Sequence, residues 1–320
     1  MDWMDKLLYP LQWVVAWVLA IFHEIFTAIG LPAANGWTWV LSIAGLTLVM
    51  RAILIPLFVY QIKSQRKMQL LQPQIQRLQA KYKGKKDQYS RQAMAEEQMN
   101  LFRDNKTSPW ASCLPLLVQM PIFFSLFRVI HNMPKVADGS IGAIGGFTQT
   151  LAQQAEQSTV FGISLSATFL ETPGIGVKLL TGVLIVIMAS TMFVTQKQMM
   201  AKNMSESAMA NPMMQSQKML LYVMPLVFGF GGLYFPLGVL FYWLVSNTWT
   251  MCQQHVVIRN MPAPGSKAEK EMLERKARKG KPVQQPEIKG GTDTAVEPTP
   301  NQSRQRQQPV SKNRKKNNKR

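Results

Sequence analysis

Apolar residues gather along this chain in long runs, and strongly polar stretches separate the runs. A run of roughly 18 or more predominantly apolar residues is typical of a helix that spans a membrane. We predict five such spans, at about 37–60, 112–131, 176–197, 218–234 and 236–257. The pattern therefore predicts an all-α integral membrane protein built around a five-helix transmembrane bundle.

A sixth apolar segment, residues 7–29, allows two interpretations. Trp13, Trp17 and the pair His23-Glu24 within it are typical of an interfacial helix on the outer face of the membrane, and we favour that interpretation. A sixth membrane helix is the alternative. A signal peptide is disfavoured because the segment lacks a clearly basic start and a small-residue cleavage site.

The distribution of Lys and Arg predicts the orientation of the spans. The chain has 36 basic and 17 acidic residues, for a net charge of +19. Basic residues crowd the connection 61–110 and the tail 259–320, whereas Lys135 is the only one in 132–175. Because basic loops stay in the cytoplasm, we expect 61–110 and the C-terminus inside, and 132–175 and the N-terminus outside.

The connection 61–110 carries its own helical pattern. Apolar side chains recur at spacings of three and four residues: Met68, Leu71, Ile75, Leu78 and Tyr82. We expect Pro73 to begin a helix separate from the membrane span, a turn at 83–86 and a second helix over about 87–102. This predicts a cytoplasmic helical hairpin. Its apolar stripe favours a docking element over a solvated spacer.

The tail 259–320 is rich in Pro, Gly, Gln, Lys and Arg, so we expect it to be disordered. Its end is a dense basic cluster, made of Lys312, Arg314, Lys315, Lys316, Lys319 and Arg320. Anionic lipids of the inner leaflet and the RNA phosphates of a ribosome are both suitable partners for such a cluster. The sequence does not separate the two, and both can operate.

Arg51 is the most informative residue, because it lies inside the predicted span 37–60. A cation at membrane depth costs roughly 2.5–3.5 kcal/mol on insertion scales, so it usually faces a watery cavity or a partner. An acid on a neighbouring helix would neutralise it, but the other four predicted spans contain no Asp or Glu. An unpaired cation in a cavity points to the reception of something negative or polar.

The sequence gives little support for catalysis. Cys113 and Cys252 lie in apolar segments, and no Cys or His has the spacing of a metal site, so we expect no cofactor. Without a GxSG or HExxH motif or a pair of intramembrane aspartates, we expect no enzyme. An anion transporter or channel is the main alternative, because a buried Arg often marks an anion path. The absence of a repeated span pattern argues against it. A tether for ribosomes would leave Arg51 unexplained.

Several local sequences carry a family resemblance. They are residues 46–57 around Arg51, 72–76 in the hairpin, 108–123, 161–166, and 234–247. Together, in this order, they resemble the YidC/Oxa1/Alb3 family of membrane protein insertases, although Ser112 stands where the family usually has Gly. The likeness covers most of the chain, from about residue 9 to 259.

The resemblance implies a division of the chain and a site. Residues 1–36 would be the N-terminal helix, 37–258 the membrane core and 259–320 the tail. The core would enclose a hydrophilic groove open to the cytoplasm and lined by Arg51, Thr47, Gln119, Tyr242 and Trp243. The implied partners are nascent membrane proteins, with the ribosome, the Sec translocon and signal recognition components. The implied location is the plasma membrane of a bacterium.

Overall fold

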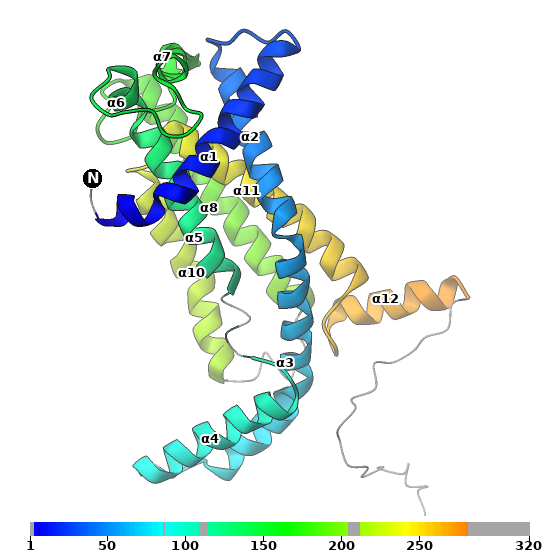
Figure 1. Cartoon of the computed structure of the whole chain (residues 1–320). Coiled ribbons are helices and arrows are strands. Elements are labelled where there is room, and N and C mark those ends of the chain that lie inside the picture. Colours follow the sequence, from blue (N-terminus) through cyan, green and yellow to red (C-terminus); the bar gives the residue numbers. More distant parts are fainter. Residues whose placement is uncertain (1–2, 86, 109, 111–113, 204–211, 281–320) are drawn as a thin grey trace, which may run out of the picture. The chain divides into compact units, whose positions relative to one another are not determined.

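The computed structural model describes residues 3–85, 87–108, 110, 114–203 and 212–280, which are mostly helical (Figure 1). The helices are α1 (Trp3–Ala28), α2 (Gly36–Ile53), α3 (Ile55–Lys81), α4 (Gln88–Asp104), α5 (Leu114–His131), α6 (Met133–Ala137), α7 (Gln149–Gln157), α8 (Ile175–Asn203), α10 (Pro212–Gly232), α11 (Leu237–Asn260) and α12 (Lys267–Arg278). Two short strands, β1 (Thr159–Val160) and β2 (Ile163–Ser164), pair antiparallel.

Three helices in the described part of the chain are long and apolar enough to cross a membrane. They are Lys6–Ala28 of α1, Gly36–Ile53 of α2 and Ile175–Lys202 of α8. The apolar stretches Leu117–His131 of α5 and Leu221–Gly232 of α10 are shorter. The predicted helical class is confirmed, whereas the bundle of five spans stays a prediction. Both interpretations of the first helix stay open, because α1 has the length and composition of a span.

Two predicted helix boundaries are wrong. We expected one helix over 37–60, but α2 ends at Ile53 and α3 begins at Ile55. The break precedes Pro56, which cannot donate a backbone hydrogen bond to the turn before it. We also expected Pro73 to begin a helix, but α3 continues through it to Lys81.

The helices pack around one main apolar core. α11 lies against α2 and α8, α10 lies against α8, and α1 lies against α2 and α5. Trp39 of α2, Leu126 of α5 and Leu240 of α11 are each about 1% exposed in this core. The His23 ring of α1 stacks on Trp39 at a centroid distance of 4.0 Å. This contact joins α1 to α2, so the first helix is part of the core.

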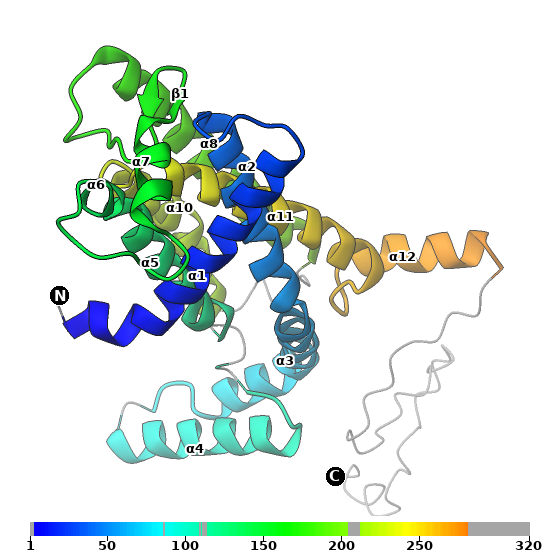
Figure 2. The same cartoon turned by 45° about the horizontal axis from the view of Figure 1, so that its top comes forward.

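The connection 132–175 forms a small cap of its own (Figure 2). It contains α6, α7 and the β1–β2 pair, whose two-residue turn Phe161-Gly162 has positive φ at both positions. Such a turn matches the twist of a tight hairpin. Gly36, at the start of α2, lies so close to this hairpin that a Cβ there would be 2.3 Å from the Thr159 carbonyl oxygen. The cap is therefore fixed against the α2 start.

Candidate functional site

Arg51 lies in the last turn of α2 and bonds to α11. Its Nη2 donates to the hydroxyl of Ser246 and, at 3.4 Å, to the carbonyl oxygen of the same residue. Its Nε is buried and has no hydrogen-bond partner in the described part of the chain. The guanidinium is thus held by neutral groups on a residue 195 positions away in the sequence.

No carboxylate neutralises Arg51 among the described residues. The only ion pair between residues in 3–85, 87–108, 110, 114–203 and 212–280 joins Lys81 to Glu97. The interpretation of Arg51 as one half of a buried ion pair therefore finds no support in this region. A partly buried charge without a counter-ion favours a site that receives negative charge or water.

Arg51 borders a pocket of about 150 Å³ between α3 and α11. The guanidinium carbon of Arg51 lies over the ring of Phe58 of α3, 5.6 Å from the ring centroid. We call this space the glutamine pocket. Its lining combines apolar side chains such as Phe58 and Met199, and a second cation, Arg66, with six amide and hydroxyl side chains: Gln61, Gln65, Gln69, Thr250, Gln253 and Gln254. Such groups offer both hydrogen-bond donors and acceptors, so the pocket can hold water or a polar peptide segment.

A second pocket of about 240 Å³ adjoins the glutamine pocket. Three residues line both pockets: Met199 of α8, and Thr250 and Gln254 of α11. Thr195 and Asn247 add further polar groups. The shared lining makes one continuous tract of polar and apolar side chains that leads from Arg51 toward α8.

The other predicted groove residues lie in different surroundings. Thr47 is buried and donates to the carbonyl of Ile43 at 2.7 Å within its own helix, and it lines neither pocket. Gln119 donates from Nε2 to the hydroxyl of Tyr242. Tyr242 lies one helical turn before Ser246, so α11 connects the Gln119 contact to the Arg51 contact.

Trp243 lies in an aromatic cluster rather than in the pockets. Its ring is 5.1 Å from Phe123 of α5, 4.9 Å from Phe228 of α10 and 5.5 Å from Phe235. These contacts hold α5, α10 and α11 together. The structure therefore gives Trp243 a packing role.

Sequence reasoning missed Ser246 and the glutamines. Gln61, Gln65 and Gln69 recur every four residues, which places them on one face of α3. This polar stripe was visible in the sequence, but it fell in a stretch assigned to the hairpin. Ser246 gave no signal, because its contact with Arg51 depends on tertiary packing.

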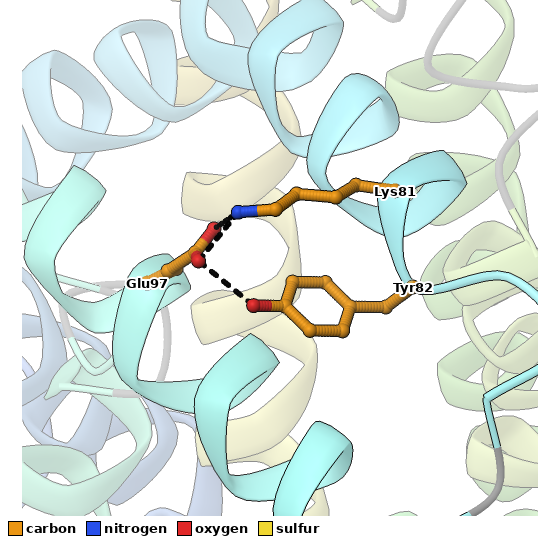
Figure 3. Close-up of polar contacts among 3 residues, drawn as sticks. All are labelled: Lys81, Tyr82 and Glu97. Carbon is orange, nitrogen blue, oxygen red and sulfur yellow. Dashed lines mark hydrogen bonds and ion pairs between the residues drawn. The ribbon is translucent and has the colours of Figure 1, made fainter.

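A polar contact joins the C-terminal end of α3 to the middle of α4 (Figure 3). Lys81 Nζ lies 2.6 Å from Glu97 Oε1, and the Tyr82 hydroxyl donates to the same oxygen at 2.8 Å. The hydrogen bond from Lys81, followed by that from Tyr82, lowers the pKa of the Glu97 carboxyl. The contact is therefore strongest above the ordinary pKa range of Glu and is lost as the pH falls through the lowered pKa.

The two helices are held chiefly by an apolar seam. Leu71 and Ile75 of α3 pack with Phe102 of α4, and all three are less than about 5% exposed. Met68 and Leu101, which are partly buried, pack against this seam. The seam keeps α3 and α4 side by side (Figures 1 and 2).

We expect Phe102→Ala to loosen α4 from α3, because it empties the seam. The usual cost of such a change is about 3–5 kcal/mol. Hydrogen exchange of α4 should then be faster by about a hundredfold or more. Tyr89→Ala is the matched control, since Tyr89 lies on the same helix and is 81% exposed. Equal protection in the two variants would show that the seam does not hold the hairpin.

Parts of the predicted site lie outside the described residues. They are the residues of the tail cluster: Lys312, Arg314, Lys315, Lys316, Lys319 and Arg320. Cys113, which we expected to have no metal or disulfide role, also lies outside them. The expectation that this cluster binds lipid or RNA stays a prediction.

A sequence model of the family described as 60Kd inner membrane protein matches residues 31–264. The chain belongs to this family. A relative from Streptomyces avermitilis, named membrane protein insertase YidC, is 42% identical over 270 residues, and the match covers 82% of this chain and 60% of the relative. The relative of the same name from Bifidobacterium longum is 38% identical over 320 residues, covering 97% of this chain and 95% of the relative.

A solved structure also matches the present chain. It is described as an active YidC insertase crystal structure with the first transmembrane domain resolved. The sequences are 26% identical, and the match covers 80% of this chain and 47% of the other, with a TM-score of 0.43. The resemblance to insertases that the sequence motifs indicated is thus confirmed by the family match and the named relatives.

Proposed function

We propose that this chain inserts newly made membrane proteins into the plasma membrane of a bacterium and helps them to fold there. Its membership of the 60Kd inner membrane protein family and the names of its relatives support the proposal. The observation that carries it within the molecule is Arg51, a partly buried cation without a described carboxylate partner at the edge of the glutamine pocket.

In this proposal the two adjoining pockets are part of a hydrophilic groove within a five-helix bundle. A hydrophilic segment of the client enters from the cytoplasm and exchanges its water for the amides and hydroxyls of the groove. Arg51 attracts Asp or Glu side chains in that segment, because its charge is not neutralised by a described carboxylate. The segment then has a thinner apolar layer left to cross.

The client's own apolar helix supplies the driving force. Each CH₂ group that leaves water for the lipid contributes about 0.8 kcal/mol. No covalent bond forms or breaks, so the protein lowers a barrier to transfer without acting as an enzyme. The hydrogen bond between Arg51 and Ser246 keeps the cation positioned for a passing segment.

The hairpin of α3 and α4 and the basic tail would recruit partners on the cytoplasmic side. Nascent membrane proteins arrive on ribosomes, whose RNA phosphates suit the tail cluster at 312–320. Anionic lipids, signal recognition components and the Sec translocon are further proposed partners. The protein is proposed to work either alone or with the translocon.

The test is insertion of a short single-span client by the purified full chain in liposomes. Protease protection of the client's outer segment should exceed that in empty liposomes. Anion flux through the same liposomes is measured in parallel. Protection without flux supports an insertase, whereas flux without protection would overturn the proposal in favour of an anion transporter or channel.

A further inference from the structure

A charged pocket of about 360 Å³ lies away from Arg51, between the ends of α8 and α11 and the helix α12. Its basic side chains come from all three helices: Lys202 of α8, Arg259 of α11, and Arg275 and Arg278 of α12. Glu271 and Glu274 of α12 also line it. The proposed insertase activity gives this pocket no role.

The pocket keeps an excess of positive charge that its own carboxylates do not neutralise. Four cations face two carboxylates, yet none of these residues forms an ion pair within the described part of the chain. Arg275 donates instead to the backbone carbonyls of Arg259, at 2.8 Å, and Glu271, at 3.3 Å. The guanidinium of Arg275 is therefore fixed in place, and the pocket is ready for an external anion.

The local structure fixes the start of α12, the helix that supplies half of the pocket's charged side chains or more. Ser266 caps α12 by accepting from the Glu269 amide, and Glu269 in turn accepts from the Gly265 amide at 2.6 Å. This reciprocal capping fixes where α12 begins. Ala268 is 2% exposed, and α12 packs against both α8 and α11.

The position of the pocket points to the kind of anion. Lys202 and Arg259 lie in the last turns of α8 and α11, and α8 is long and apolar enough to cross a membrane. Basic side chains that directly follow a span lie at the level of the lipid headgroups. The lining also contains Ile258, an apolar side chain that suits the lipid side of such a site, and the ring of His255.

We propose that this pocket binds the phosphate headgroup of an anionic phospholipid on the cytoplasmic side of the membrane. Lys202, Arg259 and Arg278 attract the phosphate, and Arg275 holds α12 in position beside it. The proposal rests on the proposed function in one respect, namely that α8 and α11 cross the membrane. The bound lipid would join α12, and with it the start of the tail, to the membrane surface.

The test compares the full chain with the double variant Arg259→Gln/Arg278→Gln, in detergent, by native mass spectrometry. The two substitutions leave the backbone carbonyl that Arg275 binds intact. Bound phosphatidylglycerol should fall about tenfold relative to the unchanged protein, and phosphatidylcholine should be unaffected. Lys270→Gln/Lys279→Gln is the matched control, since it removes the same charge from exposed positions at α12 outside the pocket.

Equal phosphatidylglycerol binding by the pocket variant and the unchanged protein would overturn the proposal, and so would an equal loss in the control. Displacement of the lipid by inorganic phosphate would show a site for free anions instead. Displacement by a short RNA would show a nucleic-acid site. Lipid binding is measured without a client, so its loss does not depend on the insertase activity. Insertion of a client into liposomes by the same variants then tests the insertase activity by itself.

Discussion

Arg51→Ala should lower the insertion of clients with acidic outer segments by about ten- to a hundredfold. This range corresponds to the loss of one hydrogen bond to a charged group, about 1.5–3 kcal/mol, during transfer. A client whose acidic residues are changed to Asn or Gln should be inserted equally by both proteins. The measurement is protease protection in liposomes that contain only the purified chain and defined lipids.

Two variants separate the charge of Arg51 from its packing. Arg51→Lys keeps a cation and should retain most of the selectivity for acidic clients. Ser246→Ala removes the hydroxyl that Arg51 contacts but leaves the charge, so acidic clients should still be preferred. If Arg51→Ala impairs acidic and neutralised clients equally, Arg51 serves the packing of α2 on α11 and not the client.

Changing the six basic residues of the tail cluster to Gln should abolish most salt-sensitive attachment to ribosomes. They are Lys312, Arg314, Lys315, Lys316, Lys319 and Arg320. Six phosphate contacts predict a roughly thousandfold loss of affinity between about 50 and 200 mM salt for the unchanged chain, and a much flatter dependence for the variant. Co-sedimentation with ribosomes over a salt series measures this.

Deletion of residues 286–311 is the control for the tail, because it shortens the chain and keeps the cluster. This variant should retain the steep salt dependence. Co-sedimentation with phosphatidylglycerol liposomes separates attachment to RNA from attachment to lipid. A salt dependence that is identical in all three proteins would contradict a role of the cluster in ribosome binding.

The sequence predicted the helical class because long apolar runs have few alternative structures. It identified Arg51 because a cation inside such a run requires an explanation. It did not identify Ser246, since two residues 195 positions apart meet only through the packing of α2 on α11. The contact that holds this partly buried cation is therefore a tertiary feature that one sequence does not reveal.

The errors at the two prolines have a different cause. Pro56 lies in the first turn of α3, just after the break from α2, whereas Pro73 lies inside α3, although both lack a backbone donor. Leu71 and Ile75, on either side of Pro73, are buried against Phe102. This packing offsets the cost of a proline in a helix, which is about 3 kcal/mol or more. Long-range packing thus explains why α3 continues through Pro73.

The prediction of the site was also incomplete because the sequence does not show where the helix that contains a span ends. Gln61, Gln65 and Gln69 were assigned to a cytoplasmic hairpin on composition, but they share a pocket with Arg51. Composition marks where apolar residues stop, not how far a helix continues beyond them. The stripe of glutamines on α3 was visible in the sequence. That it lines a pocket became clear only from the position of α11 beside it.

Cross-linking during insertion tests the groove most directly. A photo-reactive amino acid replaces Gln254, which lines both pockets, or Leu226 of α10, which is 61% exposed and lines neither. An insertion intermediate with an acidic outer segment is then irradiated in liposomes. The groove predicts adducts between that segment and position 254, with few at position 226. Equal adducts at both positions, or adducts at 226 alone, would contradict the account.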